Sequence, residues 1–163
     1  MQRISKENYY LDIAQTVLER ATCLRRVYGA IIVKNDEIIS TGYNGAPRGR
    51  RNCVDMGYCT REQLRVPRGE RYELCRSVHA EANAIISAAR RDMIGGTLYL
   101  VGRDAASGEL LHDTTSCAMC RRMIINSGIT RVVNRIGDDG IEIIDVQNWI
   151  VNDESIQPKA EAE

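Results

Sequence analysis

The sequence lacks net charge, a long apolar run and an apolar leader segment. Its 22 lysines and arginines balance 22 acidic residues, which removes any whole-chain argument for a nucleic-acid partner. The first seven residues, MQRISKE, contain no apolar signal core, and no run approaches the roughly 20 residues of a membrane span. We therefore expect a soluble cytoplasmic protein that binds neither membranes nor nucleic acids. Phenylalanine is also absent, which by itself indicates no function.

Cysteine, in contrast, occurs six times in 163 residues. In a reducing compartment, cysteines are more often metal ligands or buried thiols than disulfides. The length suits one domain with its own core, which we place at residues 1–152. A charged, alanine-rich tail at 153–163 is expected to be flexible.

Helical and strand patterns alternate along the chain. A first helix, capped by Ser5, precedes two β-branched strands at 27–33 and 38–43, with turn residues at 35–36 and a close-approach glycine, Gly29. The later elements are expected as follows: helix 79–91, strand 97–101, helix 117–127, strands 129–133 and 141–146, and a helical turn at 147–151. This order predicts the α/β class with a mixed sheet.

One long stretch, residues 44–78, fits neither periodicity. It contains glycines, prolines and three cysteines. An irregular segment of this length inside a compact domain is usually functional or disordered, and the cysteines argue against disorder.

Two short motifs carry metal-site chemistry. His79 and Glu81 begin a helical pattern, and Cys117 and Cys120 begin another. A catalytic zinc takes three protein ligands and keeps a fourth position for water, whose pKa it lowers towards neutrality. His79, Cys117 and Cys120 supply those three, which leaves Glu81 to move protons. This combination is the known signature of zinc deaminases, H-x-E followed by P-C-x-x-C.

Each half of this signature alone has a structural explanation. A lone C-x-x-C can be half of a structural zinc site or two buried thiols, and a lone histidine can cap a helix. The conjunction at the starts of two helices favours catalysis. Glu81 discriminates between the two interpretations, because a structural zinc site needs no proton shuttle.

The segment CRSVHAEANAII at 75–86, together with GYNGAPRG at 42–49 and Asn52-Cys53, resembles the deoxycytidylate (dCMP) deaminases of the cytidine deaminase-like superfamily. The resemblance extends over about residues 6–144. It implies a three-layer sandwich with a central five-stranded mixed sheet covered by helices. It also implies zinc-dependent deamination of dCMP to dUMP and ammonia for thymidylate synthesis, commonly by a homohexamer.

Regulation is implied as well: activation by dCTP with magnesium, and inhibition by dTTP. The resemblance assigns Asn44, the Ala80 N–H and the carbonyl of Ser116 to the substrate. It assigns effector binding to Gly42, Tyr43, Gly45 and Arg90. From the sequence alone, Tyr43 could equally stack on a base or lie in the core, and Arg90 could form a surface salt bridge.

Two positions depart from the family pattern. Ser116 stands where the family has proline, but its backbone carbonyl can still accept from the leaving amino group, and serine caps helices well. Asn134 stands where many relatives have an aromatic residue after the fourth strand, which changes the expected contacts to substrate or phosphate.

Four cysteines remain, and four is the number that a closed structural zinc site requires. Three lie in or beside the irregular stretch, where a metal would restrain loose backbone. We expect either a second zinc or four separate buried thiols. These cysteines are Cys23, Cys53, Cys59 and Cys75.

The irregular stretch is also basic. Its arginines suit a nucleotide phosphate, although a solvated charged loop would show the same composition. The arginines concerned are Arg48, Arg50, Arg51, Arg65, Arg68 and Arg71.

Two alternatives stay open at this point. One is a tRNA adenosine deaminase or a free cytidine deaminase, against which the long cysteine-rich stretch argues. The other is a non-catalytic, zinc-stapled nucleotide-binding protein.

Overall fold

The computed structural model describes residues 1–156, and the greater part of the expected tail, 157–163, lies outside the described residues. The first tail residues form a short 3-10 helix, Glu154–Ile156. Within the described part, no helix is long and apolar enough to cross a membrane.

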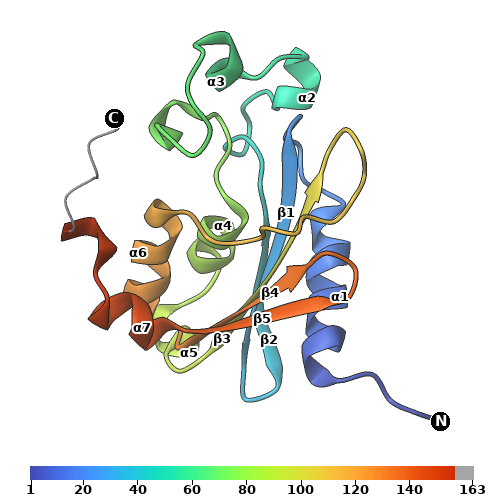
Figure 1. Cartoon of the computed structure of the whole chain (residues 1–163), viewed down its shortest axis with the longest axis vertical. Helices are drawn as coiled ribbons and strands as arrows, with labels where there is room; N and C mark the ends of the chain where they lie inside the picture. The colour runs from blue at the N-terminus through green and yellow to red at the C-terminus, as the bar shows by residue number, and fades with distance from the viewer. Residues whose placement is uncertain (157–163) are drawn as a thin grey trace, which may run out of the picture.

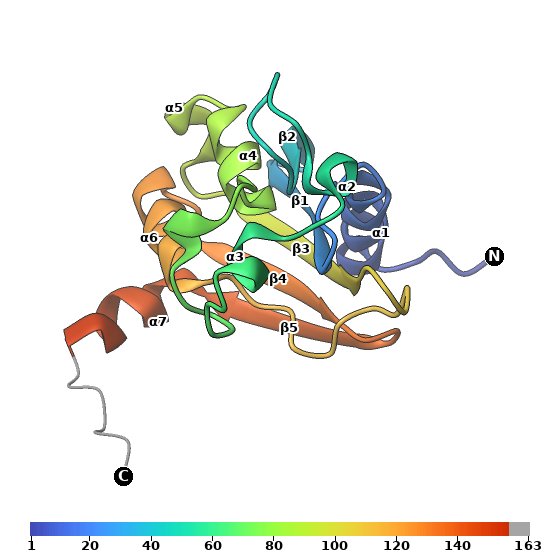
Figure 2. The same ribbon diagram turned by 90° about the horizontal axis from the view of Figure 1, so that it is seen from above.

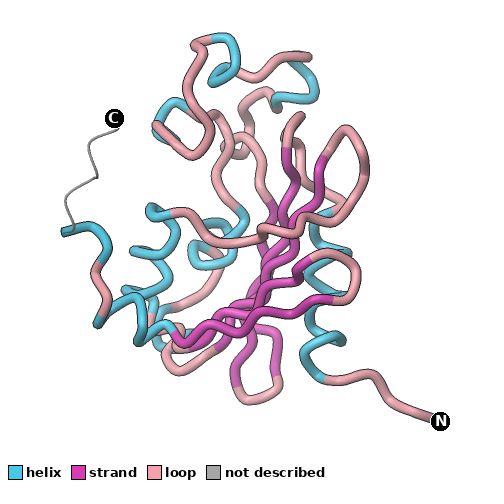
Figure 3. The backbone as a smooth tube through the Cα atoms, viewed as in Figure 1, coloured by secondary structure: helices cyan, strands magenta, loops and turns pink. Residues whose placement is uncertain are grey.

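A five-stranded sheet forms the middle layer, in the order β2-β1-β3-β4-β5 (Figure 3). Only β3 and β4 are parallel, so the sheet is mixed, as expected. The strands are β1 (Arg26–Lys34), β2 (Glu37–Tyr43), β3 (Thr97–Asp104), β4 (Arg131–Ile136) and β5 (Gly140–Asp145).

Helices cover both faces of this sheet (Figures 1 and 2). One face carries α1, and the other carries α4 and α6. The helices are α1 (Lys6–Leu18), α2 (Cys53–Met56), α3 (Thr60–Gln63), α4 (Ala80–Ile86), α5 (Arg90–Met93), α6 (Ala118–Ser127) and α7 (Val146–Val151). The expected α/β sandwich is therefore confirmed.

The irregular stretch 44–78 lies at one end of the sheet, where β1 begins and β2 ends (Figure 1). It contains two single-turn helices, α2 and α3, and the 3-10 helix Tyr72–Leu74. Such short helices leave no apolar periodicity in a sequence, which explains why none was expected there.

The helix expected at 79–91 is wrong as a single element. It ends at Ile86, and Ala89 is extended, with φ −77° and ψ 139°, before α5 begins at Arg90. Ile86 is 72% exposed whereas Met93 is 3% exposed. In a continuous helix these two residues, seven apart, would share one face. The break lets Met93 turn into the core.

Two expected strands also differ in length. β3 runs three residues further than expected, to Asp104, because β1 pairs with it as far as Arg26. The polar character of these residues concealed a strand that its partner stabilises. β4 runs on to Ile136, so Asn134 lies within the strand, fully buried, and not after it.

Two glycines permit the close contacts that bring helices onto the sheet. A Cβ on Gly29 would lie 2.1 Å from the Ala14 carbonyl oxygen of α1, which confirms the close approach expected there. A Cβ on Gly42 would lie 2.3 Å from the Ala80 oxygen and 2.4 Å from the Ala84 nitrogen of α4. Gly42 therefore fixes the distance between β2 and the helix that begins after His79.

We expect Gly42→Ala to destabilise the protein by about 1–3 kcal/mol, because α4 must move off β2 to admit the methyl group. Urea unfolding would measure the loss as a lower midpoint. Thr41→Ala, at an exposed position of the same strand, is the control and should cost less than about 1 kcal/mol. Equal midpoints for the two variants would show that the close contact is unimportant.

Candidate metal centre and pocket

The two motifs meet at the starts of α4 and α6. His79 is the N-cap residue of α4, Cys117 is the N-cap residue of α6, and Cys120 lies one turn into α6. The Nδ1 atom of His79 is 3.5 Å from Cys117 Sγ and 3.4 Å from Cys120 Sγ. Among residues 1–156, this is the one set of three potential metal ligands whose donor atoms all lie within 4.8 Å of each other.

These distances suit zinc. With Zn–S near 2.3 Å and Zn–N near 2.0 Å, tetrahedral geometry places nitrogen and sulfur about 3.5 Å apart. One imidazole and two thiolates also form a donor set that zinc prefers. The three expected ligands therefore fit the metal and leave one position of a tetrahedron free.

The three ligand side chains influence each other's protonation in the metal-free chain. Burial disfavours an imidazolium, but hydrogen bonds with Cys117 and Cys75 outweigh it and raise the pKa of His79 to about 10. The hydrogen bond from Cys120 lowers the pKa of Cys117 to about 4. The same bond raises the pKa of Cys120. These directions favour a thiolate on Cys117 and protons on Cys120 and His79 when no metal is bound.

Glu81 lies beside these ligands and is not one of them. It is the second residue of α4 and is 4% exposed, and burial raises the pKa of its carboxyl group. A carboxyl whose pKa is raised exchanges protons more readily near neutral pH than an ordinary glutamate does. This placement agrees with the proton-shuttle role expected for Glu81.

Ser116 lies next to the same centre and is 1% exposed. Its backbone carbonyl accepts a hydrogen bond of 3.0 Å from Arg121 Nε, which leaves one lone pair for a ligand. Its hydroxyl is buried and has no hydrogen-bond partner among the described residues. Serine at this position therefore keeps a backbone carbonyl that can accept from a ligand, while its buried hydroxyl is unsatisfied.

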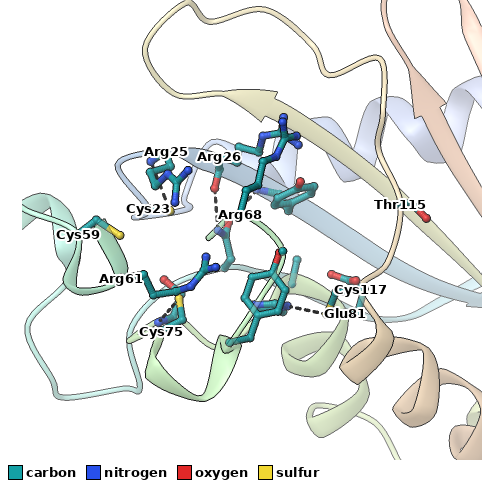
Figure 4. A pocket seen from close by; sticks show the side chains of 17 residues that line it. Cys23, Arg25, Arg26, Cys59, Arg61, Arg68, Cys75, Glu81, Thr115 and Cys117 are labelled. Atoms are coloured by element: carbon teal, nitrogen blue, oxygen red, sulfur yellow. Dashed lines mark hydrogen bonds between the residues drawn. The ribbon is translucent and has the colours of Figure 1, made fainter. Parts of the chain in front are cut away.

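A pocket opens above Glu81, with walls from β1, the segment before it and the stretch 44–78 (Figure 4). Ala80 lines it, and the first N–H groups of a helix have no intrahelical acceptor. Asn44 lines it too, while its side chain accepts from the Tyr28 N–H at 2.8 Å and donates to the Arg26 carbonyl at 2.9 Å. Asn44 thus holds the end of β2 against β1, with one amide hydrogen left over.

The residues expected to bind an effector do not line this pocket. Gly42 is buried beneath α4, Gly45 pairs with Val78 in an isolated bridge, and Tyr43 is 38% exposed. Arg90 belongs to α5, where its Nε donates to the Asn126 carbonyl of α6 at 2.7 Å. Because α4 and α5 are separate helices, Arg90 does not lie on the helix that begins after His79.

The four remaining cysteines gather near the pocket. Cys23, Cys59 and Cys75 line it, and Cys53 is buried. No three of the four meet the 4.8 Å condition that the His79 group meets. Burial raises the pKa of Cys53, and the other three thiols raise it further. Figure 4 shows the Cys23, Cys59 and Cys75 side chains on one side of the pocket.

Several pocket residues are not marked by any sequence motif, among them Arg61 and Tyr72. The Arg61 guanidinium carbon lies 4.5 Å above the centre of the Tyr72 ring, whose centre is in turn 5.0 Å from that of His79. Nothing in the local sequence distinguishes Arg61, which is 6% exposed, from the exposed arginines around it. Of the six arginines that the sequence singled out, only Arg68 lines the pocket.

Residues 4–135 match the family described as the cytidine and deoxycytidylate deaminase zinc-binding region. The chain belongs to this family. It is 37% identical over 138 residues to the deoxycytidylate deaminase of Mycobacterium phage D29, covering 82% of this chain and 96% of that one. It is 34% identical over 131 residues to the deoxycytidylate deaminase of Schizosaccharomyces pombe, covering 80% of this chain and 37% of that one.

A solved family structure has the same architecture. The apo dCMP deaminase of cyanophage S-TIM5 is 25% identical and superposes with a TM-score of 0.58, covering 85% of this chain and 88% of that one. The chain thus spans most of the phage relatives but little more than a third of the fission-yeast protein. Family membership shows that the chain is a zinc-binding deaminase, and the roles of the individual motif residues stay predictions.

We expect zinc to bind more tightly as pH rises. Because the pKa values of His79 and Cys120 are raised, each side chain carries a proton at pH 7. Metal binding should therefore release about two protons. Zinc must displace both protons at any pH below the two pKa values, so the affinity for zinc falls as the pH is lowered. Calorimetry of zinc binding in buffers of different ionisation enthalpy would count the protons. Release of none at pH 7 would contradict the protonation states described above.

Proposed function

We propose that the protein hydrolytically deaminates dCMP to dUMP and ammonia. The observation that carries this proposal is the position of Glu81: a buried carboxyl with a raised pKa beside three zinc ligands, at the floor of a pocket with arginine walls. The names of the phage and yeast relatives support dCMP as the substrate.

Different residues of the chain bind the substrate and transfer the proton. The Ala80 N–H binds the pyrimidine carbonyl oxygen, and the Ser116 carbonyl accepts from the 4-amino group. Zinc, when bound, supplies a Lewis acid that makes water nucleophilic at neutral pH. Glu81 takes a proton from that water and delivers it to the departing amine, so that a C–O bond replaces the C–N bond.

Ammonia release from dCMP, CMP, deoxycytidine, dCTP, cytidine and a tRNA anticodon stem tests this function directly. We expect turnover of dCMP, and we expect Glu81→Gln to keep its zinc while losing about 10²–10⁴-fold in kcat. His79→Ala is the matched control, because it should lose both zinc and activity. Zinc loss from Glu81→Gln would show that Glu81 is structural. Turnover of cytidine or of a tRNA anticodon stem in place of dCMP would favour the alternative deaminases.

We also propose the finer properties of dCMP deaminases for this chain: activation by dCTP with magnesium, inhibition by dTTP, a homohexamer, and supply of dUMP for thymidylate synthesis. The GYNGAPRG segment at 42–49 supports them. Because Gly42 is buried beneath α4, an effector at this segment would contact Tyr43 and the residues that follow. Repeating the dCMP assay with dCTP–magnesium or dTTP tests regulation, and an unchanged rate would contradict it.

A second, structural zinc on Cys23, Cys53, Cys59 and Cys75 is a further proposal. Two of these sulfurs already accept backbone hydrogen bonds: Cys23 from the Arg25 N–H and Cys75 from the Ser77 N–H, each at 3.4 Å. Such bonds favour thiolates, and thiolates bind zinc.

Elemental analysis by mass spectrometry should find two zinc ions per wild-type chain. It should find one in Cys53→Ser, which lacks one buried thiol of this group but keeps His79, Cys117 and Cys120. Cys117→Ser should also bind one, but should lose deaminase activity. A single zinc in the wild-type chain would instead support four separate thiols.

A further inference from the structure

Arg61 is a buried cation without an anionic partner. It is 6% exposed, and among residues 1–156 no carboxylate forms a salt bridge with it. Its Nη2 donates to two backbone carbonyls, those of Pro67 at 3.1 Å and Glu70 at 2.6 Å. Its Nε is buried and has no acceptor within the described residues. Burying an unpaired charge is costly, so an anion at this position would stabilise Arg61.

The other arginines of the same pocket each form a salt bridge within the chain. Arg25 pairs with Glu62 at 2.9 Å. Arg26 and Arg68 share Asp113, at 3.2 and 2.8 Å. Arg61 is therefore the lining arginine that forms no salt bridge within the described residues, and Figure 4 shows it reaching into the pocket from the stretch 44–78.

A second unpartnered donor lies on the same wall. The Ser77 hydroxyl is buried and makes no hydrogen bond within the described residues. Ser77 is two residues before the zinc ligand His79, and Tyr72 lies between Arg61 and His79, in contacts of 4.5 and 5.0 Å. The Tyr72 ring therefore separates the Arg61 guanidinium from His79. At this separation Arg61 can contact a substituent of the substrate, but it is too far from the metal ligands to contact the reacting atom.

We propose that Arg61 binds the phosphate of a nucleoside 5′-monophosphate and thereby selects nucleotides over nucleosides, an inference that rests on the proposed function. A phosphate offers several acceptor oxygens and up to two negative charges, which match a guanidinium with an unused N–H and a neighbouring hydroxyl. Arg61 is then a specificity residue and takes no part in the bond changes at the pyrimidine.

Two other partners would suit the same cation. The first is a cysteine thiolate of the second zinc site. Burial raises the pKa of Cys75, but the positive charge of Arg61 lowers it and so favours the thiolate. The phosphates of an effector nucleotide are the other. The experiment must separate the phosphate of the substrate from both.

We would compare Arg61→Gln and Arg61→Lys with wild type, using dCMP and deoxycytidine without effector. The expected result is a loss of about 10–100-fold in kcat/KM for dCMP in Arg61→Gln, mainly through KM, with deoxycytidine unchanged. Arg61→Lys should recover part of the loss. Arg50→Ala, at an exposed position of the same stretch and outside the pocket, is the control and should change neither substrate.

Three results would overturn the proposal. They are an equal loss for both substrates, loss of one zinc per chain from Arg61→Gln, and a change in the dCTP response alone. Calorimetric binding of inorganic phosphate, present in wild type and absent in Arg61→Gln, tests the anion site without turnover. If wild type binds phosphate but does not deaminate dCMP, the proposed function fails while the anion site stands. If Arg61→Gln binds phosphate as wild type does, the site is wrong.

Discussion

The arrangement of the site depends on how closely α4 lies against the sheet. Gly42 admits the backbone of Ala80 and Ala84 at distances that no side chain would allow. Ser40 secures the same contact by donating to the Ala84 carbonyl at 2.7 Å. Because interiors are close-packed, a small outward shift of α4 would carry His79 away from the two cysteines of α6. Ligand geometry at the metal is therefore set by small residues on β2 that never touch it.

The stretch 44–78 completes the site that the two helices begin. The helices supply the metal ligands and Glu81, while the stretch supplies cationic, aromatic and thiol groups to the pocket wall. Arg61 also holds its own loop together through the carbonyls of Pro67 and Glu70. One buried side chain thus stabilises a backbone without regular structure and contributes a positive charge to the pocket wall.

The sequence predicted which side chains meet at the starts of α4 and α6, because that signal is local. The spacing of His79 and Glu81, and of Cys117 and Cys120, carries the chemistry directly, and each pair begins a helix that the apolar pattern also marks. The close approach at Gly29 was predicted for a similar reason, because glycine inside a strand is costly without a packing role.

Features that depend on distant partners were not predictable. The break after Ile86 depends on which side chains reach the core, and the last residues of β3 on their pairing with β1. The burial of Arg61 depends on how two short helices fold over one end of the sheet. Periodicity contains no information about these contacts, since each joins segments far apart in the chain.

The three ligands of the metal centre lie on either side of β3 in the sequence, at His79 and at Cys117 and Cys120. They can converge only after β3 has entered the sheet beside β1 and the crossover through α6 has begun to close onto β4. Such non-local pairing forms slowly compared with a local helix or hairpin. Tight metal capture is therefore a late event in folding, and a chain that retains its metal has already completed the central part of its topology.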